Sequence, residues 1–351
     1  MNFTRKKTAS AALGIALAGA ALVSAPAAAN GVAEHFKDKT VTILIPYGPG
    51  GTYDKYGQTF ARHMDKFIPG EPNMIVKHMP GAGGAKAMNY AYNVMPKDGL
   101  NMITPLDNTV VNQLLRPEKM RYESGKFIWL GATNQTNVIL VASLKKGIAS
   151  LEDWKKSGAE MIGSSSGIAS TSTLIPNYVM SALKLKGKVV AGYKGSSASI
   201  FAVERGEADM SAFNWLAWSS KVPHWFEGDK PFAKALVQAG VWKDPDLPDV
   251  PMLEDVVPAE YKAGAKFLGT LGPLGRGLAL PPGVPQLVIE PLRTAYDRMN
   301  ADPAFAAELK KRKLRLIPSK GADIQKTVED AMTATTPEVI AFVREAIFPK
   351  K

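Results

Sequence analysis

Hydrophobic residues along the chain fall into short β-branched runs, each followed by a glycine-rich break and then by apolar residues at helical spacing. Residues 40–46 (TVTILIP) form the first run, residues 48–51 (GPGG) break it, and apolar positions recur at helical spacing over residues 56–67. The same order returns at residues 74–95, and residues 100–104 supply a third strand. This β–loop–α repetition predicts an α/β fold with a parallel sheet and its glycine loops at the carboxyl ends of the strands.

The pattern begins again in the middle of the chain. We expect four further strands there, with hydroxyl- and glycine-rich breaks between them, at residues 137–142, 160–163, 189–193 and 209–213. Residues 284–347 are predicted to be helical, with breaks at Pro318 and Pro337. Two similar α/β halves in one chain predict two lobes.

The first 29 residues are typical of a secretory signal peptide. Basic side chains at positions 5–7 precede an apolar, alanine-rich stretch at residues 11–23, and residues 27–29 (AAA) satisfy the A-x-A cleavage pattern. The stretch is shorter than the roughly 20 residues of a membrane span. We therefore expect export and cleavage near Ala29, which removes three basic side chains and lowers the formal net charge from +11 to +8.

Composition narrows the possible functions. A hydrophobic content of 46% over 351 residues excludes a disordered chain. The absence of cysteine excludes disulfides, thiolate metal sites and a cysteine nucleophile, and the four histidines are too scattered for a metal motif. We expect no cofactor and no metal. An exported basic protein fits anionic small solutes or a membrane surface better than nucleic acid.

The glycine loops are candidate anion sites. A strand–loop–helix junction presents unpaired backbone N–H groups at the positive end of a helix, and the sequence holds four such junctions, two in each expected lobe. The loops do not match nucleotide-binding motifs. Residues 81–86 (GAGGAK) lack the last glycine of a dinucleotide-binding motif, and residues 48–55 lack the Gly-Lys-Ser/Thr of a phosphate-binding loop. Because one helix terminus contributes only about 0.3–1 kcal/mol, several loops must converge on the ligand.

Residues 164–173 (SSSGIASTST) are denser in hydroxyl groups than a turn requires, and hydroxyls together with amides suit a carboxylate. Helix capping is the alternative reading for each single hydroxyl. Trp215 and Trp218, beside Asn214, either pack in the core or form a flat wall against the apolar body of a ligand.

Residues 163–167 (GSSSG) also match the G-x-S-x-G nucleophile elbow, and Asp209 and His224 follow in hydrolase order. A secreted serine hydrolase using Ser165, Asp209 and His224 is therefore the alternative function. The short spacing between Ser165 and His224 leaves little room for the remaining sheet of a hydrolase, so we expect a binding protein and no enzyme.

The ordered set of motifs resembles the tripartite tricarboxylate transporter substrate-binding proteins, the Bug family of periplasmic solute-binding proteins. The resemblance extends from about residue 40 to residue 285, and the ordered set is specific although each glycine-rich piece alone is weak. The motifs that carry it are PYxxGGxxD (46–54), PGAGG (80–84), PxDG (96–99), GYxG (192–195), ERGE (204–207), LPDVP (247–251) and LPPGVP (280–285).

The resemblance implies a two-lobe periplasmic-binding-protein fold (Venus flytrap, type II) with mostly parallel sheets. Residues 30–136 and 267–351 would form the first lobe, and residues 137–266 the second. The implied function is capture of an organic carboxylate, either a di- or tricarboxylate or an aromatic acid, and delivery to the membrane permease subunits of a tripartite tricarboxylate transporter. Docking on a sensor kinase stays open as an alternative. We expect a periplasmic monomer.

In the resembled family the ligand's carboxylate is held by the loop after the first strand, by the PGAGG loop and by the hydroxyl-rich helix start of the second lobe. Two departures affect the ligand's identity: Thr52-Tyr53 puts a bulky ring beside Asp54, and Lys194 replaces a usual proline and would supply a cation if it faced the cleft. The expected ligand-binding residues are Tyr47, Gly50, Gly51, Thr52, Tyr53, Asp54, Gly83, Gly84, Asn108, Asn134, Ser164, Ser165, Ser166, Ser170, Thr171, Lys194, Asn214 and Trp215.

Overall fold

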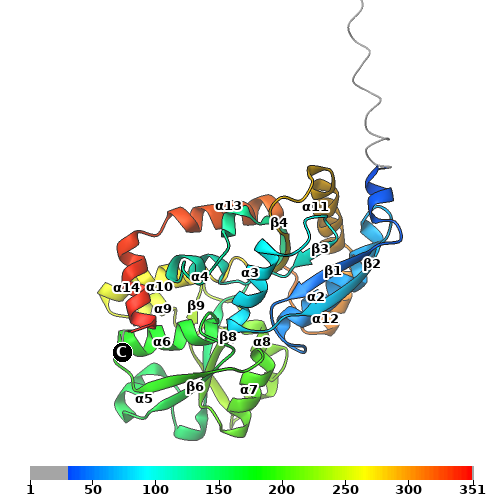
Figure 1. The fold of residues 1–351 in the computed structure, drawn as a ribbon. Coiled ribbons are helices and arrows are strands. Elements are labelled where there is room, and N and C mark those ends of the chain that lie inside the picture. The colour runs from blue at the N-terminus through cyan, green and yellow to red at the C-terminus, as the bar shows by residue number, and fades with distance from the viewer. Residues whose placement is uncertain (1–30, 350–351) are drawn as a thin grey trace, which may run out of the picture.

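The computed structural model describes residues 31–349, and the expected signal peptide at residues 1–29 lies outside them. Two separate β-sheets, each covered by helices, form the two lobes (Figure 1). No helix between residues 31 and 349 combines the length and the apolar character needed to cross a bilayer. The expected α/β class with two lobes is confirmed.

The first lobe is built on a six-stranded sheet in the order β11-β4-β10-β3-β1-β2. Its strands are β1 (Thr40–Ile45), β2 (Asn73–His78), β3 (Asn101–Ile103), β4 (Ile128–Asn134), β10 (Arg276–Leu280) and β11 (Ser319–Lys320). The helices that follow or cover these strands are α2 (Thr52–His63), α3 (Ala85–Asn93), α4 (Thr109–Leu115), α11 (Gln286–Asn300), α12 (Pro303–Lys311) and α13 (Gly321–Thr333).

The second lobe has a five-stranded sheet in the order β7-β6-β8-β5-β9. Its strands are β5 (Val138–Ser143), β6 (Met161–Ser165), β7 (Gly187–Ala191), β8 (Met210–Asn214) and β9 (Ala233–Ala239). Its helices are α5 (Leu151–Ser157), α6 (Thr171–Leu183), α7 (Ser196–Arg205), α8 (Trp215–Ser219), α9 (Leu253–Val256) and α10 (Lys262–Gly269).

Both sheets are mixed rather than mostly parallel as expected. The β–loop–α units pair in parallel, as predicted: β1 pairs with β2 and β3, and β6 with β7 and β8. Strands that return from the other lobe run antiparallel, namely β10 beside β3 and β4 and β5 beside β8 and β9. The amino end of an antiparallel strand lies at the same edge as the carboxyl ends of its parallel neighbours. Residues that begin β10 therefore reach the edge that carries the glycine loops.

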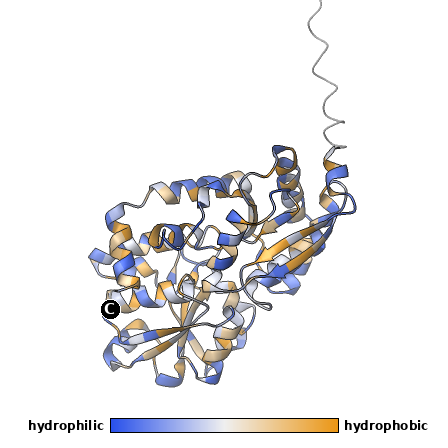
Figure 2. Ribbon diagram, viewed as in Figure 1, coloured by the Kyte–Doolittle hydropathy of each residue, from blue (hydrophilic) through white to orange (hydrophobic). Residues whose placement is uncertain are grey.

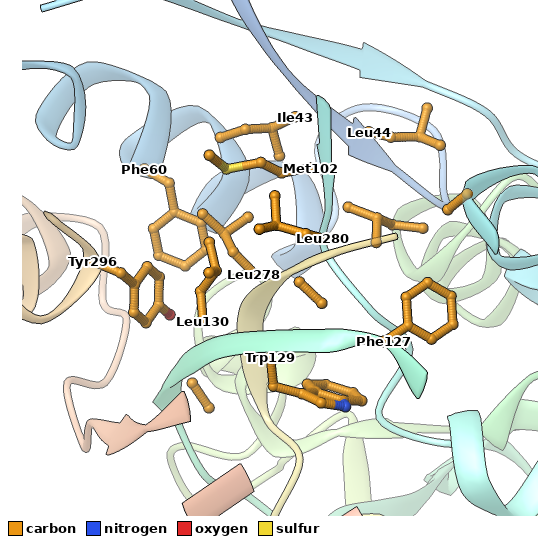
Figure 3. Packing of buried hydrophobic residues seen from close by; sticks show 14 of the residues in the cluster. Ile43, Leu44, Phe60, Met102, Phe127, Trp129, Leu130, Leu278, Leu280 and Tyr296 are labelled. Atoms are coloured by element: carbon orange, nitrogen blue, oxygen red, sulfur yellow. The ribbon is translucent and has the colours of Figure 1, made fainter. Parts of the chain in front are cut away.

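Each lobe has its own apolar core. In the first lobe, Ile43, Met102 and Leu278 from three adjacent strands pack against Phe60 of α2 and Tyr296 of α11 (Figure 3). Strands β1 and β5 consist mostly of apolar residues, whereas the helices mix apolar and polar positions (Figure 2). This contrast explains why continuous runs predicted the strands and helical spacing predicted the helices.

The second sheet is covered on both faces, which accounts for the unbroken apolar run of β5. Val138 and Leu140 face α6, α10 and the last helix, whereas Ile139 and Val141 face α7 and a group of tryptophans. The last helix, α14 (Pro337–Ile347), packs against α6 of the second lobe (Figure 1). The chain thus crosses between the lobes once more after α13. Residues 267–351 were expected in the first lobe, but the last helix of this segment packs against the second lobe.

Candidate functional site

A cavity lies between the two lobes. Its first-lobe lining comes from the loop after β1, the loop after β3 and the start of β10. Its second-lobe lining comes from the starts of α6 and α7 and from the junction of β8 with α8. The residues that line it are Tyr47, Gly51, Thr52, Tyr53, Asp107 and Arg276 from the first lobe, and Thr171, Ser196, Phe213, Asn214 and Ala217 from the second.

Three helices begin at this cavity. Thr52 starts α2, Thr171 starts α6 and Ser196 starts α7, and all three residues line the cavity. The residues that precede α2 and α7 are glycines, Gly51 and Gly195, so no side chain there accepts the first N–H groups of these helices. Free N–H groups at converging helix starts bind an anion. The predicted convergence of several loops is therefore present in the structure.

Arg276 and Asp107 are the charged residues of the cavity, and sequence reasoning missed both. Their side chains are only 3% and 6% exposed, and Arg276 Nη1 donates to Asp107 Oδ2 at 2.9 Å. The guanidinium also lies 3.7 Å from the centre of the Tyr53 ring and donates from Nε and Nη2 to Thr52 Oγ1 at 3.4 and 3.3 Å. The cavity therefore holds one fixed positive and one fixed negative charge.

Asn134 positions the backbone of Arg276. The two residues pair across β4 and β10, and the Arg276 N–H donates to Asn134 Oδ1 at 2.6 Å. Asn134 Nδ2 donates in turn to the Tyr56 hydroxyl at 3.0 Å. Burial by itself would lower the pKa of Arg276, but the charge of Asp107 and its hydrogen bond to the guanidinium hold that pKa above its ordinary value. Asn134, expected to contact the ligand, instead fixes the strand that carries the guanidinium.

Two tyrosines form one wall of the cavity. The rings of Tyr47 and Tyr53 lie 5.0 Å apart. The Tyr47 hydroxyl donates to Gly83 O at 2.9 Å, and the Tyr53 hydroxyl accepts the Asp107 N–H at 2.9 Å. Burial raises the pKa of both phenols well above their ordinary value, with Asp107 adding to the effect. Both side chains therefore stay neutral and contribute ring faces and hydroxyl groups.

The expected serines form a hydroxyl network beneath the cavity and do not line it. Ser165 Oγ lies 2.7 Å from Thr173 Oγ1 and accepts from Ser172 Oγ at 2.9 Å. Ser164 Oγ donates to Ser199 O at 2.9 Å, and Ser170 caps α6. These contacts are those of helix capping and loop support, which the sequence left as the alternative interpretation of each hydroxyl. Thr171 alone of the expected hydroxyl residues of this segment faces the cavity.

Several other expected residues hold the loops or the lobes together. Asp54 accepts from the Gly50 N–H at 2.7 Å and lies 2.8 Å from His78 Nε2, which fixes the loop before α2. Asn108 Nδ2 donates to Ala169 O across the lobes. Gly83 and Gly84 lie where the lobes touch, and the Gly83 N–H donates to Ser166 O at 3.2 Å. None of these side chains is part of the cavity lining.

Lys194 and Trp215 also lie off the cavity. The Lys194 side chain is exposed beside an outer groove, and the Lys194 carbonyl accepts the Gly48 N–H of the first lobe at 2.9 Å. The Trp215 ring packs on Phe226 at 5.1 Å, and its Nε1 donates to Asp246. The apolar wall of the cavity comes instead from Phe213 and Ala217.

The residues of the alternative hydrolase do not meet. Ser165 ends β6, whereas Asp209 precedes β8, which runs parallel to β6. A five-residue strand of roughly 16 Å separates these two edges of the sheet. Asp209 Oδ2 pairs with Lys146 Nζ at 2.7 Å, and His224 is exposed. Within residues 31–349, neither His224 nor Asp209 forms a hydrogen bond with Ser165, and no cluster of His, Asp or Glu could hold a metal ion.

No protein-family model matches the chain. A UPF0065 protein of Bordetella pertussis is 22% identical over 317 residues, covering 89% of this chain and 92% of that protein. A second UPF0065 protein, from the tcbD-tcbE intergenic region of Pseudomonas sp. strain P51, is 22% identical over 282 residues, covering 78% of each chain.

Solved structures share the fold over nearly their whole length. The periplasmic binding protein BugD is 18% identical with a TM-score of 0.69, covering 89% of this chain and 98% of that one. MatC from Rhodopseudomonas palustris with bound malate is 21% identical with a TM-score of 0.66, covering 86% and 99%. Rpa4515 of R. palustris with adipate is 17% identical with a TM-score of 0.68, covering 87% and 97%. The resemblance predicted from the motifs is confirmed.

Proposed function

We propose that the protein is a periplasmic solute-binding protein of the Bug and TctC type, which closes its two lobes on a small organic carboxylate. The observation that carries this proposal is the meeting of three helix starts and one buried guanidinium at a single interlobe cavity. Helix starts and arginine both favour a carboxylate. The malate and adipate bound by two similar proteins support the same ligand class.

Binding in such a site is coupled to closure. Each lobe supplies one part of the cavity, so a ligand that contacts both parts stabilises the closed arrangement in proportion to those contacts. The loaded clamshell then docks on the permease subunits of a tripartite tricarboxylate transporter. The similarity to the Bug-type proteins supports this last step, and the ligand undergoes no reaction.

The proposal can be tested on protein recovered from the periplasm. We expect intact-mass measurement to show cleavage near Ala29, and native mass spectrometry to detect a carboxylic acid bound in a one-to-one complex that denaturation releases. Retention of the full chain in the cytoplasm would contradict the export part. A released ligand that lacks a carboxylate would contradict the binding part.

A further inference from the structure

The Arg276–Asp107 pair leaves hydrogen-bonding capacity unused. A guanidinium has five N–H donors. Arg276 uses its Nε and Nη2 on Thr52 Oγ1 and its Nη1 on Asp107 Oδ2 and Gly275 O. One Nη2–H is left over. Asp107 accepts through Oδ2, while its Oδ1 forms no hydrogen bond with any residue between 31 and 349.

Both members of the pair line the cavity that would enclose a ligand. The other ionisable residues of the lining are Tyr47 and Tyr53, whose raised pKa values keep them neutral. The lining therefore has no net charge when empty. A ligand with a carboxylate alone would leave one negative charge uncompensated in a closed cavity, which is costly.

We propose that the Arg276–Asp107 pair selects 2-amino carboxylates over carboxylates without the amino group. This inference rests on the proposed function and names its substrate class. The ligand's carboxylate takes the spare Nη2–H of Arg276 and the N–H groups of the helix starts. The ligand's ammonium donates to Asp107 Oδ1, which restores charge balance in the cavity. A 2-hydroxy group also donates to Asp107 but carries no charge, so 2-hydroxy acids rank between the two.

The experiment compares ligands that share a carbon skeleton. Calorimetric titration of refolded protein would use three sets: aspartate, malate and succinate; alanine, lactate and propionate; phenylalanine, 3-phenyllactate and 3-phenylpropionate. In the set that fits the cavity, we expect the amino compound to bind at least about tenfold more tightly than the unsubstituted acid. Equal or tighter binding of the unsubstituted acid overturns the selectivity and leaves the proposed function standing. Failure of every carboxylate to bind overturns the proposed function itself.

Asp107→Asn makes the test residue-specific. It preserves the size of the side chain and an oxygen that accepts from Arg276, but removes the charge that would receive an ammonium. We expect the preference for the amino compound to disappear while the unsubstituted acid binds as well as before or better. Asp209→Asn is the matched control, because Asp209 pairs with Lys146 away from the cavity. A preference that persists in Asp107→Asn overturns the role of Asp107, and the wild-type comparison still decides the selectivity if the variant fails to fold.

Discussion

Gly83 of the first lobe and Gly167 of the second pack backbone against backbone where the lobes meet. Their φ angles are +69° and +143°, in the region that favours glycine. A Cβ on Gly83 would lie 2.9 Å from the Ala169 carbonyl carbon, and one on Gly167 would overlap the Gly83 backbone. The closed arrangement therefore depends on two residues without side chains.

Gly167→Ala is expected to weaken ligand binding at least about tenfold, or about 1.4 kcal/mol, because the new methyl group keeps the lobes apart. Gly192→Ala is the matched control: its φ is +130°, but a Cβ there meets no atom within 4 Å. Both variants strain the second lobe, and only the first obstructs closure. Equal affinities of the two variants in calorimetric titration would show that the contact does not control binding.

Lys221 is expected to make stability depend on pH. Its Nζ donates to Gly50 O of the other lobe, and burial, with the nearby Lys55, lowers its pKa to about 8. Between pH 8 and 10.5 the unfolded chain then binds more protons at this residue than the folded chain, so the free energy of unfolding rises with pH. Above pH 10.5 the residue is neutral in both states, and its unfavourable contribution is gone.

Lys221→Met should remove the contribution of Lys221 to this rise in the free energy of unfolding between pH 8 and 10.5. Urea unfolding of the wild type and the variant across that interval measures the difference, with the exposed Lys156→Met as the control for loss of one lysine. Parallel curves for wild type and Lys221→Met would show that Lys221 titrates as it does in the unfolded chain.

Lys194→Met is expected to change the affinity by less than about twofold for mono- and dianionic ligands alike. The sequence had indicated Lys194 as a possible cation for a second carboxylate, but its side chain is exposed beside the outer groove. Titration with matched mono- and dicarboxylates checks this. A selective loss of dianion binding would place the ammonium in the site.

Ser165→Ala is expected to act on stability more than on binding. The substitution removes the oxygen that accepts from Ser172 Oγ at 2.9 Å and from the Gly167 N–H at 3.2 Å, at a cost of about 1–3 kcal/mol. Ser181→Ala, whose hydroxyl contacts Tyr261 only at 3.4 Å, should cost less. Chemical unfolding compares the two variants. Covalent modification of wild-type Ser165 by a serine-directed fluorophosphonate would instead support the alternative function as a serine hydrolase.

The architecture was predictable because its signals are local. The apolar runs that became β1 and β5, the glycine breaks after strands and the helical spacing of α2 each depend on neighbouring residues. The gathering of glycine loops at one edge follows from the parallel pairing that this order imposes. The same local signals cannot tell a hydroxyl that faces the cavity from one that caps a helix. Thr171 and Ser170, neighbours in sequence, have these two different roles.

The charged pair was missed because its partners are 169 residues apart. Arg276 opens the apolar strand RGLAL, and Asp107 follows β3 in a loop without a glycine motif. One signal was available: a charged residue that opens a buried strand needs a partner, and Asp107 follows a strand whose carboxyl end lies at the glycine-loop edge. That β10 runs antiparallel, and so brings Arg276 to that edge, depends on the return of the chain from the second lobe.

The measurement that tests the central claim most directly is a melting-temperature screen of protein unfolded and refolded to remove any bound solute. The panel would hold aliphatic, aromatic and amino-acid carboxylates, each beside its neutral amide. A ligand at 100 times its Kd adds roughly 2.7 kcal/mol to the stability of the native state. We predict a clear rise in melting temperature for at least one carboxylate and none for its amide. A panel in which no carboxylate raises the melting temperature, or in which amides act equally, would contradict a carboxylate-binding clamshell.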